Sequence, residues 1–157
     1  MKNVVFTRID ERLIHGQIMT KWIQFSGANT VVIVDDGTAK DSFLQMIMKS
    51  SVPAKIGLKV FSVDDAISYL TGADDSDKLF LLVKTPTTLT ALVDAGIKLD
   101  AVNAGNMGAR AGREVLFRGV SANDDEKAAF KKLINGGVRC YFRNIPSDPE
   151  EDVAKHL

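Results

Sequence analysis

The chain has 157 residues, 45% of them hydrophobic and 25% charged, which is the size and balance of one ordinary soluble domain and leaves no room for a second. Lysine plus arginine equals aspartate plus glutamate at 20 each, so no overall positive field favours nucleic acid or an anionic membrane, although a local cationic pocket is compatible with this balance. The longest apolar runs, such as 79–83, fall far short of the roughly 20 residues that a membrane-spanning helix needs.

The N-terminus and the cysteine content indicate the cellular compartment. The first residues run directly into a strand-like segment without the apolar core and cleavage site of a secretory signal, so we expect a cytoplasmic protein. The single cysteine, Cys140, excludes an internal disulfide, and two histidines with one cysteine lack the spacing of a usual metal site. We therefore expect no metal and no cofactor, and interpret Cys140 as a small apolar strand residue.

Strand-like and helix-like segments alternate along the chain. Short β-branched or aliphatic runs predict seven strands, at 4–6, 30–34, 58–61, 79–83, 100–103, 115–117 and 138–142. Apolar residues at helical spacing lie between most of them: Ile18, Trp22 and Phe25; Phe43, Leu44, Ile47 and Met48; Ala66, Ile67 and Leu70; Leu89, Leu92 and Val93; and Phe130, Leu133 and Ile134. Trp22, Met46 and Met48 fit the apolar faces, which favours core packing, and the tail after Pro146 predicts a short acidic helix beginning at Pro149.

Several polar residues mark where helices begin. Thr38 with Asp41, Thr85 followed by Pro86, and Asn123 with Glu126 each place a side-chain oxygen where unpaired backbone donors need one. Because parallel neighbours require crossover connections, the alternation predicts a doubly wound α/β domain over residues 1–157, with a mainly parallel sheet of about seven strands and helices on both faces.

In such folds a ligand binds outside the carboxyl ends of the strands, where the strand order reverses. The loops expected at that edge are 8–16, 35–38, 84–86 and 103–108. The segment 103–113 contains three glycines, which indicate a loop that is flexible or closely approached by another group.

The first of these loops contains the most reactive set of side chains. It is expected to lead from the first strand into the first helix and contains Arg8, Asp10, Arg12, His15 and Gly16. A helix N-terminus and two guanidinium groups favour an anion such as phosphate, and a neutral imidazole is a competent nucleophile near neutral pH. From the residues alone, a lone histidine before a helix is more often a helix cap or a satisfied polar residue than a nucleophile, and a charged cluster of this kind usually makes surface ion pairs of small net value.

A longer match favours the reactive interpretation. The segment 8–17 (RIDERLIHGQ), followed by Trp22, resembles the phosphorylation-site signature of enzyme IIB in the mannose/fructose/sorbose family of the bacterial sugar phosphotransferase system. The resemblance covers the whole chain and includes 34–36 (VDD), 84–86 (KTP), 103–107 (NAGNM) and 144–146 (NIP). It implies a free-standing EIIB domain with the activity of a protein-N(pi)-phosphohistidine–sugar phosphotransferase.

The resemblance also implies partners and roles. His15 would accept a phosphoryl group from the phosphohistidine of a IIA partner, through Nδ1, and pass it to a sugar during uptake by the IIC and IID membrane components, which the protein would join peripherally. Arg8 and Arg12 would hold phosphoryl oxygens, while Asp10 would orient the ring or an arginine, or else cap backbone N–H groups. Gly16 would permit close approach of the phosphoryl group or ease the turn. A second group, in which loop solvation is the alternative for each member, would surround the site: Asp35, Asp36, Lys84, Asn103 and Asn106.

Two other functions are open to the residues. A receiver-like regulatory domain would be phosphorylated on Asp35 or Asp36, would depend on magnesium and would carry an alkali-labile acyl phosphate. A small hydrolase would use His15 as a base, although no nucleophile elbow accompanies it. The sequence does not distinguish a monomer from a homodimer, nor mannose, fructose, sorbose and N-acetylgalactosamine or another amino sugar as the substrate.

Overall fold

The computed structural model describes the backbone of residues 1–157 and every side chain except those of Gln17 and Ile18. The expected burial of Ile18 therefore lies outside the described residues. The strands are β1 (Asn3–Asp10), β2 (Thr30–Val34), β3 (Gly57–Phe61), β4 (Lys78–Val83), β5 (Ala101–Asn106), β6 (Glu114–Phe117), β7 (Val120–Ala122), β8 (Arg139–Phe142) and β9 (Glu151–Asp152). The helices are α1 (Gly16–Ser26), α2 (Asp36–Ala39), α3 (Ser42–Ser51), α4 (Val63–Leu70), α5 (Pro86–Asp94), α6 (Asp124–Asn135) and the 3-10 helix η1 (Val153–His156).

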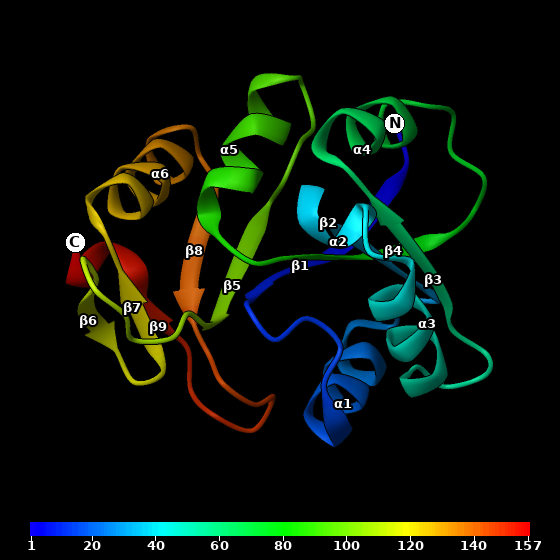
Figure 1. Cartoon of the computed structure of the whole chain (residues 1–157). Coiled ribbons are helices and arrows are strands. Elements are labelled where there is room, and N and C mark those ends of the chain that lie inside the picture. Colours follow the sequence, from blue (N-terminus) through cyan, green and yellow to red (C-terminus); the bar gives the residue numbers. More distant parts are fainter.

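A seven-stranded sheet in the order β3-β2-β4-β1-β5-β8-β9 organises the molecule. Its first six strands are parallel and only β9 runs antiparallel, along β8. Figure 1 shows α4, α5 and α6 along one side of the sheet and α1 and α3 along the other. The expected doubly wound, mainly parallel α/β fold is confirmed.

Two separate cores lie on the two faces of the sheet because the side chains of a strand alternate in direction. In β2, Val32 and Val34 belong to the core under α4, α5 and α6, whereas Val31 and Ile33 belong to the core under α1 and α3. All five residues of β2 are buried, which explains its continuous apolar sequence.

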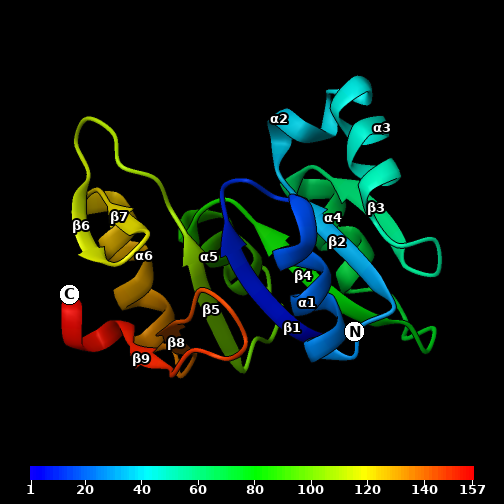
Figure 2. The same cartoon turned by 90° about the horizontal axis from the view of Figure 1, so that it is seen from below.

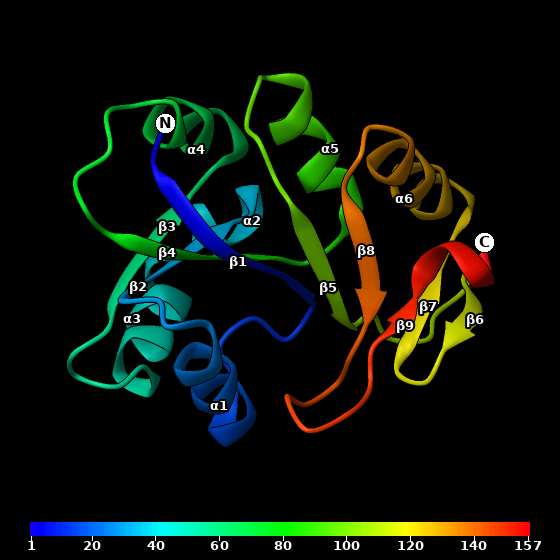
Figure 3. The same ribbon diagram turned by 180° about the vertical axis from the view of Figure 1, so that it is seen from behind.

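β1 and β4 are parallel neighbours, but the chain leaves them towards opposite edges of the sheet. From β1 the chain passes through α1 to β2, and from β4 it passes through α5 to β5 in the opposite direction. The helices α1 and α5 therefore cover opposite faces, and the carboxyl ends of β1 and β4 form the switch point where such folds bind ligands. Figure 3 shows the segment between β8 and β9 extending from the sheet towards α1.

Several expected elements differ from the observed ones. The predicted strand at 115–117 is not part of the sheet; it is β6, which pairs with β7 in a separate hairpin beside α6 (Figure 2). The seventh strand of the sheet is β9, and together with η1 it replaces the acidic helix predicted from Pro149. The reason is tertiary: β9 pairs with the edge of β8, and His156 packs edge-on against Phe117 and Phe142.

The apolar face expected for the helix around residue 47 is largely exposed. Phe43, Met46 and Ile47 are 67%, 62% and 45% exposed, whereas Met48 is buried. The helix α3 lies over the outer strands β2 and β3, where only one side of it contacts the sheet, so core packing holds for Met48 and is wrong for Met46. Of the predicted helix starts, Asp41 caps α3 and Asn123 forms a capping box with Glu126, but Thr38 lies inside α2.

Candidate active site

His15 lies at the switch point, between the end of β1 and the start of α1. It is the N-cap residue of α1, but its side chain makes no capping hydrogen bond, so the interpretation of the ring as a helix cap is wrong. The backbone turns tightly on both sides of it, since Leu13 before it has a φ of 55° and Gly16 after it a φ of 52°, both in the left-handed region. A Cβ at Gly16 would meet open space, so the need for glycine there is conformational.

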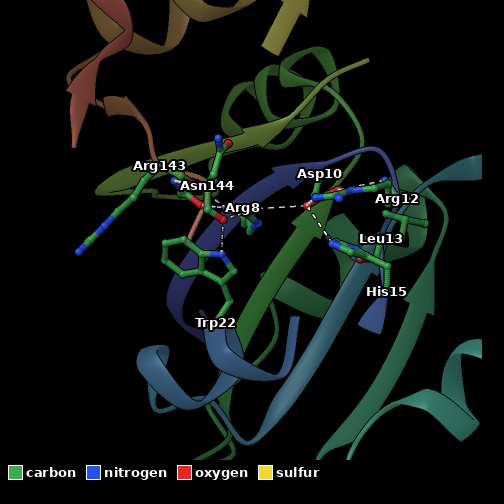
Figure 4. A network of polar contacts seen from close by, with 9 residues as sticks. Arg8, Asp10, Arg12, Leu13, His15, Trp22, Arg143 and Asn144 are labelled. Atoms are coloured by element: carbon green, nitrogen blue, oxygen red, sulfur yellow. Dashed lines mark hydrogen bonds and ion pairs between the residues drawn. The ribbon is translucent and has the colours of Figure 1, made fainter. Parts of the chain in front are cut away.

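The imidazole of His15 faces two oxygen acceptors. Its Nδ1 lies 2.8 Å from the carbonyl oxygen of Leu13, and its Nε2 lies 3.7 Å from Oδ2 of Asp10 (Figure 4). A carbonyl oxygen can only accept, so Nδ1 carries a proton in this orientation. The side chain of His15 is 21% exposed, which places the ring at the surface of the site.

The carboxylate of Asp10 is fully buried and surrounded by donors. Arg12 donates from its backbone N (3.0 Å) and Nε (3.1 Å) to Oδ1, and from Nη2 (3.1 Å) to Oδ2. Arg8 donates from Nη2 to Oδ2 at 3.2 Å, from the opposite side. Two guanidinium groups thus fix the orientation of the carboxylate and aim one oxygen at the ring of His15.

Arg8 lies completely buried beneath this arrangement. It donates to the side chain of Asn103 and to the carbonyl oxygens of Arg143 (3.0 Å) and Asn144 (3.3 Å), and its guanidinium lies 4.8 Å from the centre of the Trp22 ring. Burial lowers the pKa of Arg8, and the neighbouring Asp10 opposes that shift. Arg8 therefore supports the site from within the sheet.

The position of Arg8 and Asp10 corrects one expectation. Both were expected in the loop after the first strand, but β1 continues to Asp10 because it pairs with β4 on one side and with β5 on the other. Only residues 11–15 form the connection to α1. Of the two arginines, Arg12 has a partly exposed side chain, at 46%.

Two of the five residues expected around the site, Asn103 and Asn106, lie on β5. Asn103 is buried beside Arg8, and its Nδ2 also donates to the carbonyl oxygen of Arg143 at 3.1 Å, so it is not a solvated loop residue. Asn106 ends β5, and its carbonyl oxygen accepts from the backbone N of Glu11 at 3.1 Å. The segment expected to be a loop from residue 103 thus begins as a strand.

The acidic pair lies at the end of β2, on the same edge of the sheet. Asp35 accepts from Thr38 (2.6 Å from the hydroxyl, 2.9 Å from the backbone) and pairs with Lys84 at 3.2 Å. Partial burial disfavours the charge of Asp35, but the bonds from Thr38 and Lys84 outweigh it and lower its pKa. Asp36 instead accepts from the backbone N of Val63 at the start of α4, so it is committed to holding that helix.

Two residues, Trp22 and Gly105, support the site in ways that the sequence did not indicate. Trp22 is buried as expected, but its Nε1 also donates to the carbonyl oxygen of Asn144 at 3.0 Å. Gly105 lies against the guanidinium of Arg8, where a Cβ would come closer than 3.0 Å to it. The glycines of segment 103–113 indicated either flexibility or close approach by another group. At Gly105 the second interpretation is correct, because the guanidinium of Arg8 packs against its Cα.

Within the described residues, no group of three or more His, Cys, Asp or Glu side chains is arranged to hold a metal ion. None of the helices described here is both long and apolar enough to cross a bilayer.

Comparison with known proteins assigns the chain to a family. Residues 4–157 match the family described as the PTS system sorbose subfamily IIB component. The chain is 35% identical over 157 residues to the N-acetylgalactosamine-specific phosphotransferase enzyme IIB component 2 of Escherichia coli K12, with all of both chains covered. It is 31% identical over 144 residues to the mannose-specific EIIAB component of the same strain, covering 91% of this chain and 45% of that one.

A solved structure gives the same assignment. The IIBSor domain of the sorbose permease from Klebsiella pneumoniae superposes with a TM-score of 0.94 at 26% identity, covering 98% of this chain and 95% of that one. These matches do not favour the receiver-like alternative. The chain belongs to the sorbose subfamily of phosphotransferase-system IIB components, the phosphotransferases that relay phosphoryl groups in sugar uptake.

Proposed function

We propose that His15 is the residue that carries the phosphoryl group, and that residues 1–157 form a single EIIB domain around it. The observation behind this proposal is the position of the imidazole: it is partly exposed at the switch point, and a buried, doubly paired carboxylate faces it. Its donor would be the phosphohistidine of a IIA protein. The fusion of A and B components in the mannose-specific relative supports such a partner.

In the first step, a ring nitrogen of His15 attacks the phosphorus of the donor. A new P–N bond forms as the P–N bond of the donor breaks, and the donor imidazole leaves with its own electron pair. Asp10 favours a proton on Nε2, 3.7 Å away, which makes Nδ1 the nucleophile. In the observed orientation Nδ1 donates its proton to the carbonyl oxygen of Leu13, so the ring must first turn away from that carbonyl and give up this proton to solvent while Nε2 carries one, which leaves Nδ1 with a free electron pair.

The two arginines have different roles in this proposal. Arg12 is partly exposed and already oriented by Asp10, so it can hold oxygens of the incoming phosphoryl group. Arg8 has no exposed surface, so it orients Asp10 and does not contact phosphate. Gly16 supplies the left-handed turn that brings the ring to the start of α1.

In the second step, a sugar hydroxyl attacks phosphorus, the P–N bond to His15 breaks, and the hydroxyl proton leaves to the released imidazole or to solvent. The acceptor would be presented by IIC and IID components in the membrane, so we place the protein in the cytoplasm, peripherally bound to that transporter. The N-acetylgalactosamine-specific relative makes that amino sugar the first substrate to test.

The experiment uses ³²P-labelled, phosphorylated IIA as donor. The chain contains two histidines, so His156→Ala provides a matched control for His15→Ala. We expect label on the wild type and on His156→Ala, none on His15→Ala, and loss of the label in mild acid but not in alkali. Membrane vesicles containing IIC, IID and the sugar should then discharge it. Label that survives the His15 substitution rejects the proposal.

A further inference from the structure

A second charged cluster consists of Arg113, Glu11 and Glu126, and its member Glu11 belongs to the turn that leads to His15. The side chain of Arg113 is 1% exposed, although it comes from the segment before β6 and lies far in sequence from that turn. Its Nε and Nη2 donate to the two carboxylate oxygens of Glu126 at 2.9 and 2.5 Å, and its Nη1 donates to the carbonyl oxygen of Gly108 at 2.8 Å. Buried guanidinium groups bound on several sides have one fixed orientation.

The third partner of Arg113 belongs to the active-site turn. Oε1 of Glu11, the residue after Asp10, lies 2.5 Å from Nη1 of Arg113. Oε2 of the same carboxylate accepts from the backbone N of Gly108 at 2.9 Å, and the backbone N of Glu11 donates to Asn106. Glu11 is therefore held at both its side chain and its backbone, which fixes the first residue of the turn.

The other end of the cluster is anchored to a helix. Glu126 closes the capping box of α6 by accepting from the backbone N of Asn123 at 2.9 Å, and its side chain is 6% exposed. Burial opposes the charge of Arg113, but its bonds to Glu126 and Glu11 outweigh this and raise its pKa. The arginine thus remains charged between two carboxylates.

We infer that Arg113 is a positioning residue for phosphoryl transfer: through Glu11 it ties the turn carrying His15 to the N-terminus of α6. This inference rests on the proposed function of His15. Neither residue contacts the ring, but the clamped Glu11 lies inside the tight turn from Asp10 to Leu13, which ends two residues before His15, so the clamp sets where this turn places His15. Misplacement of a reacting group by about 1 Å costs on the order of a hundredfold in rate.

The test measures single-turnover transfer of ³²P from phosphorylated IIA to Glu11→Gln and Arg113→Met. The control is Lys132→Met, which removes a charge from an exposed ion pair with Asp94. We expect both cluster variants to transfer about 10- to 100-fold more slowly at saturating donor, with little change in the donor concentration for half-maximal rate. The control should match the wild type.

Two further measurements separate positioning from general stability. The imidazole ¹H–¹⁵N signals of His15 should shift in both cluster variants under conditions where urea unfolding shows them fully folded. The double variant should be no slower than the slower single variant, because both substitutions break one linkage. If Arg113→Met does not fold, Glu11→Gln, whose side chain is 21% exposed, decides the question.

Wild-type rates in folded cluster variants, unshifted His15 signals, or rate losses that multiply in the double variant would each overturn the inference. A wild-type chain that accepts no label from phosphorylated IIA would instead reject the proposed role of His15. The two failures are therefore distinguishable in the same experiment.

Discussion

Substitution of Gly105 by alanine tests whether the buried arginine supports the site. The added Cβ would come closer than 3.0 Å to the guanidinium of Arg8, which is fully buried and held by Asp10, Asn103 and two backbone carbonyls. Overpacking costs about 1–3 kcal/mol, and loss of one hydrogen bond to a charged group adds about 1.5–3 kcal/mol. We therefore expect the free energy of unfolding to fall by roughly 2.5 to 6 kcal/mol.

Urea unfolding, followed by the fluorescence of Trp22, measures this loss, because Trp22 is the only tryptophan and its ring lies against Arg8. Gly37→Ala is the matched control, since its Cβ would meet only an oxygen of Asp35 at an ordinary 3.5 Å. In an Arg8→Met background the cost of Gly105→Ala should shrink. An unchanged unfolding midpoint for Gly105→Ala would refute the reasoning.

Three further predictions follow from burial and charge. Burial raises the pKa of Cys140 to about 12, so its thiol should react with a disulfide reagent at pH 8 far more slowly in the folded protein than in urea. Because the pKa of Asp35 is lowered on folding, Asp35→Asn should destabilise the protein at neutral pH, and the difference from the wild type should shrink as the pH falls below about 3.9; a constant difference in urea titrations would contradict this. Arg12→Ala should fold normally but accept the phosphoryl group slowly. Arg8→Ala should lose about 3–5 kcal/mol in the free energy of unfolding, because it leaves the buried carboxylate of Asp10 without one of its partners. Equal urea unfolding midpoints for the two variants would contradict this difference between the arginines.

Much of the fold was predictable because the relevant signals are local. The apolar runs that became β2 and β4 are buried on both faces, so their sequences identify central parallel strands without further information. The capping box of Asn123 and Glu126 marks the start of α6 in the same way. The position of His15 at the carboxyl edge then follows from the topology.

The features that the sequence predicted wrongly depend on contacts between residues that lie far apart in the chain. Nothing near Glu151 indicates that it will pair with β8, and nothing in the spacing of Phe43 and Met46 indicates that α3 lies over the outer strands with one side exposed. The burial of Arg8 depends on Asn103 and on the segment after β8, more than 90 residues away in each case. Hydrophobic pattern and spacing carry no information about such partners.

The role of His15 is tested most directly by locating the phosphoryl group. The protein, phosphorylated by IIA and kept at neutral to alkaline pH, can be digested and fragmented in a mass spectrometer with a method that preserves the P–N bond. We predict one modified residue, His15, at a stoichiometry that approaches one group per chain. Modification at Asp35, Asp36 or His156 with His15 unmodified would contradict it.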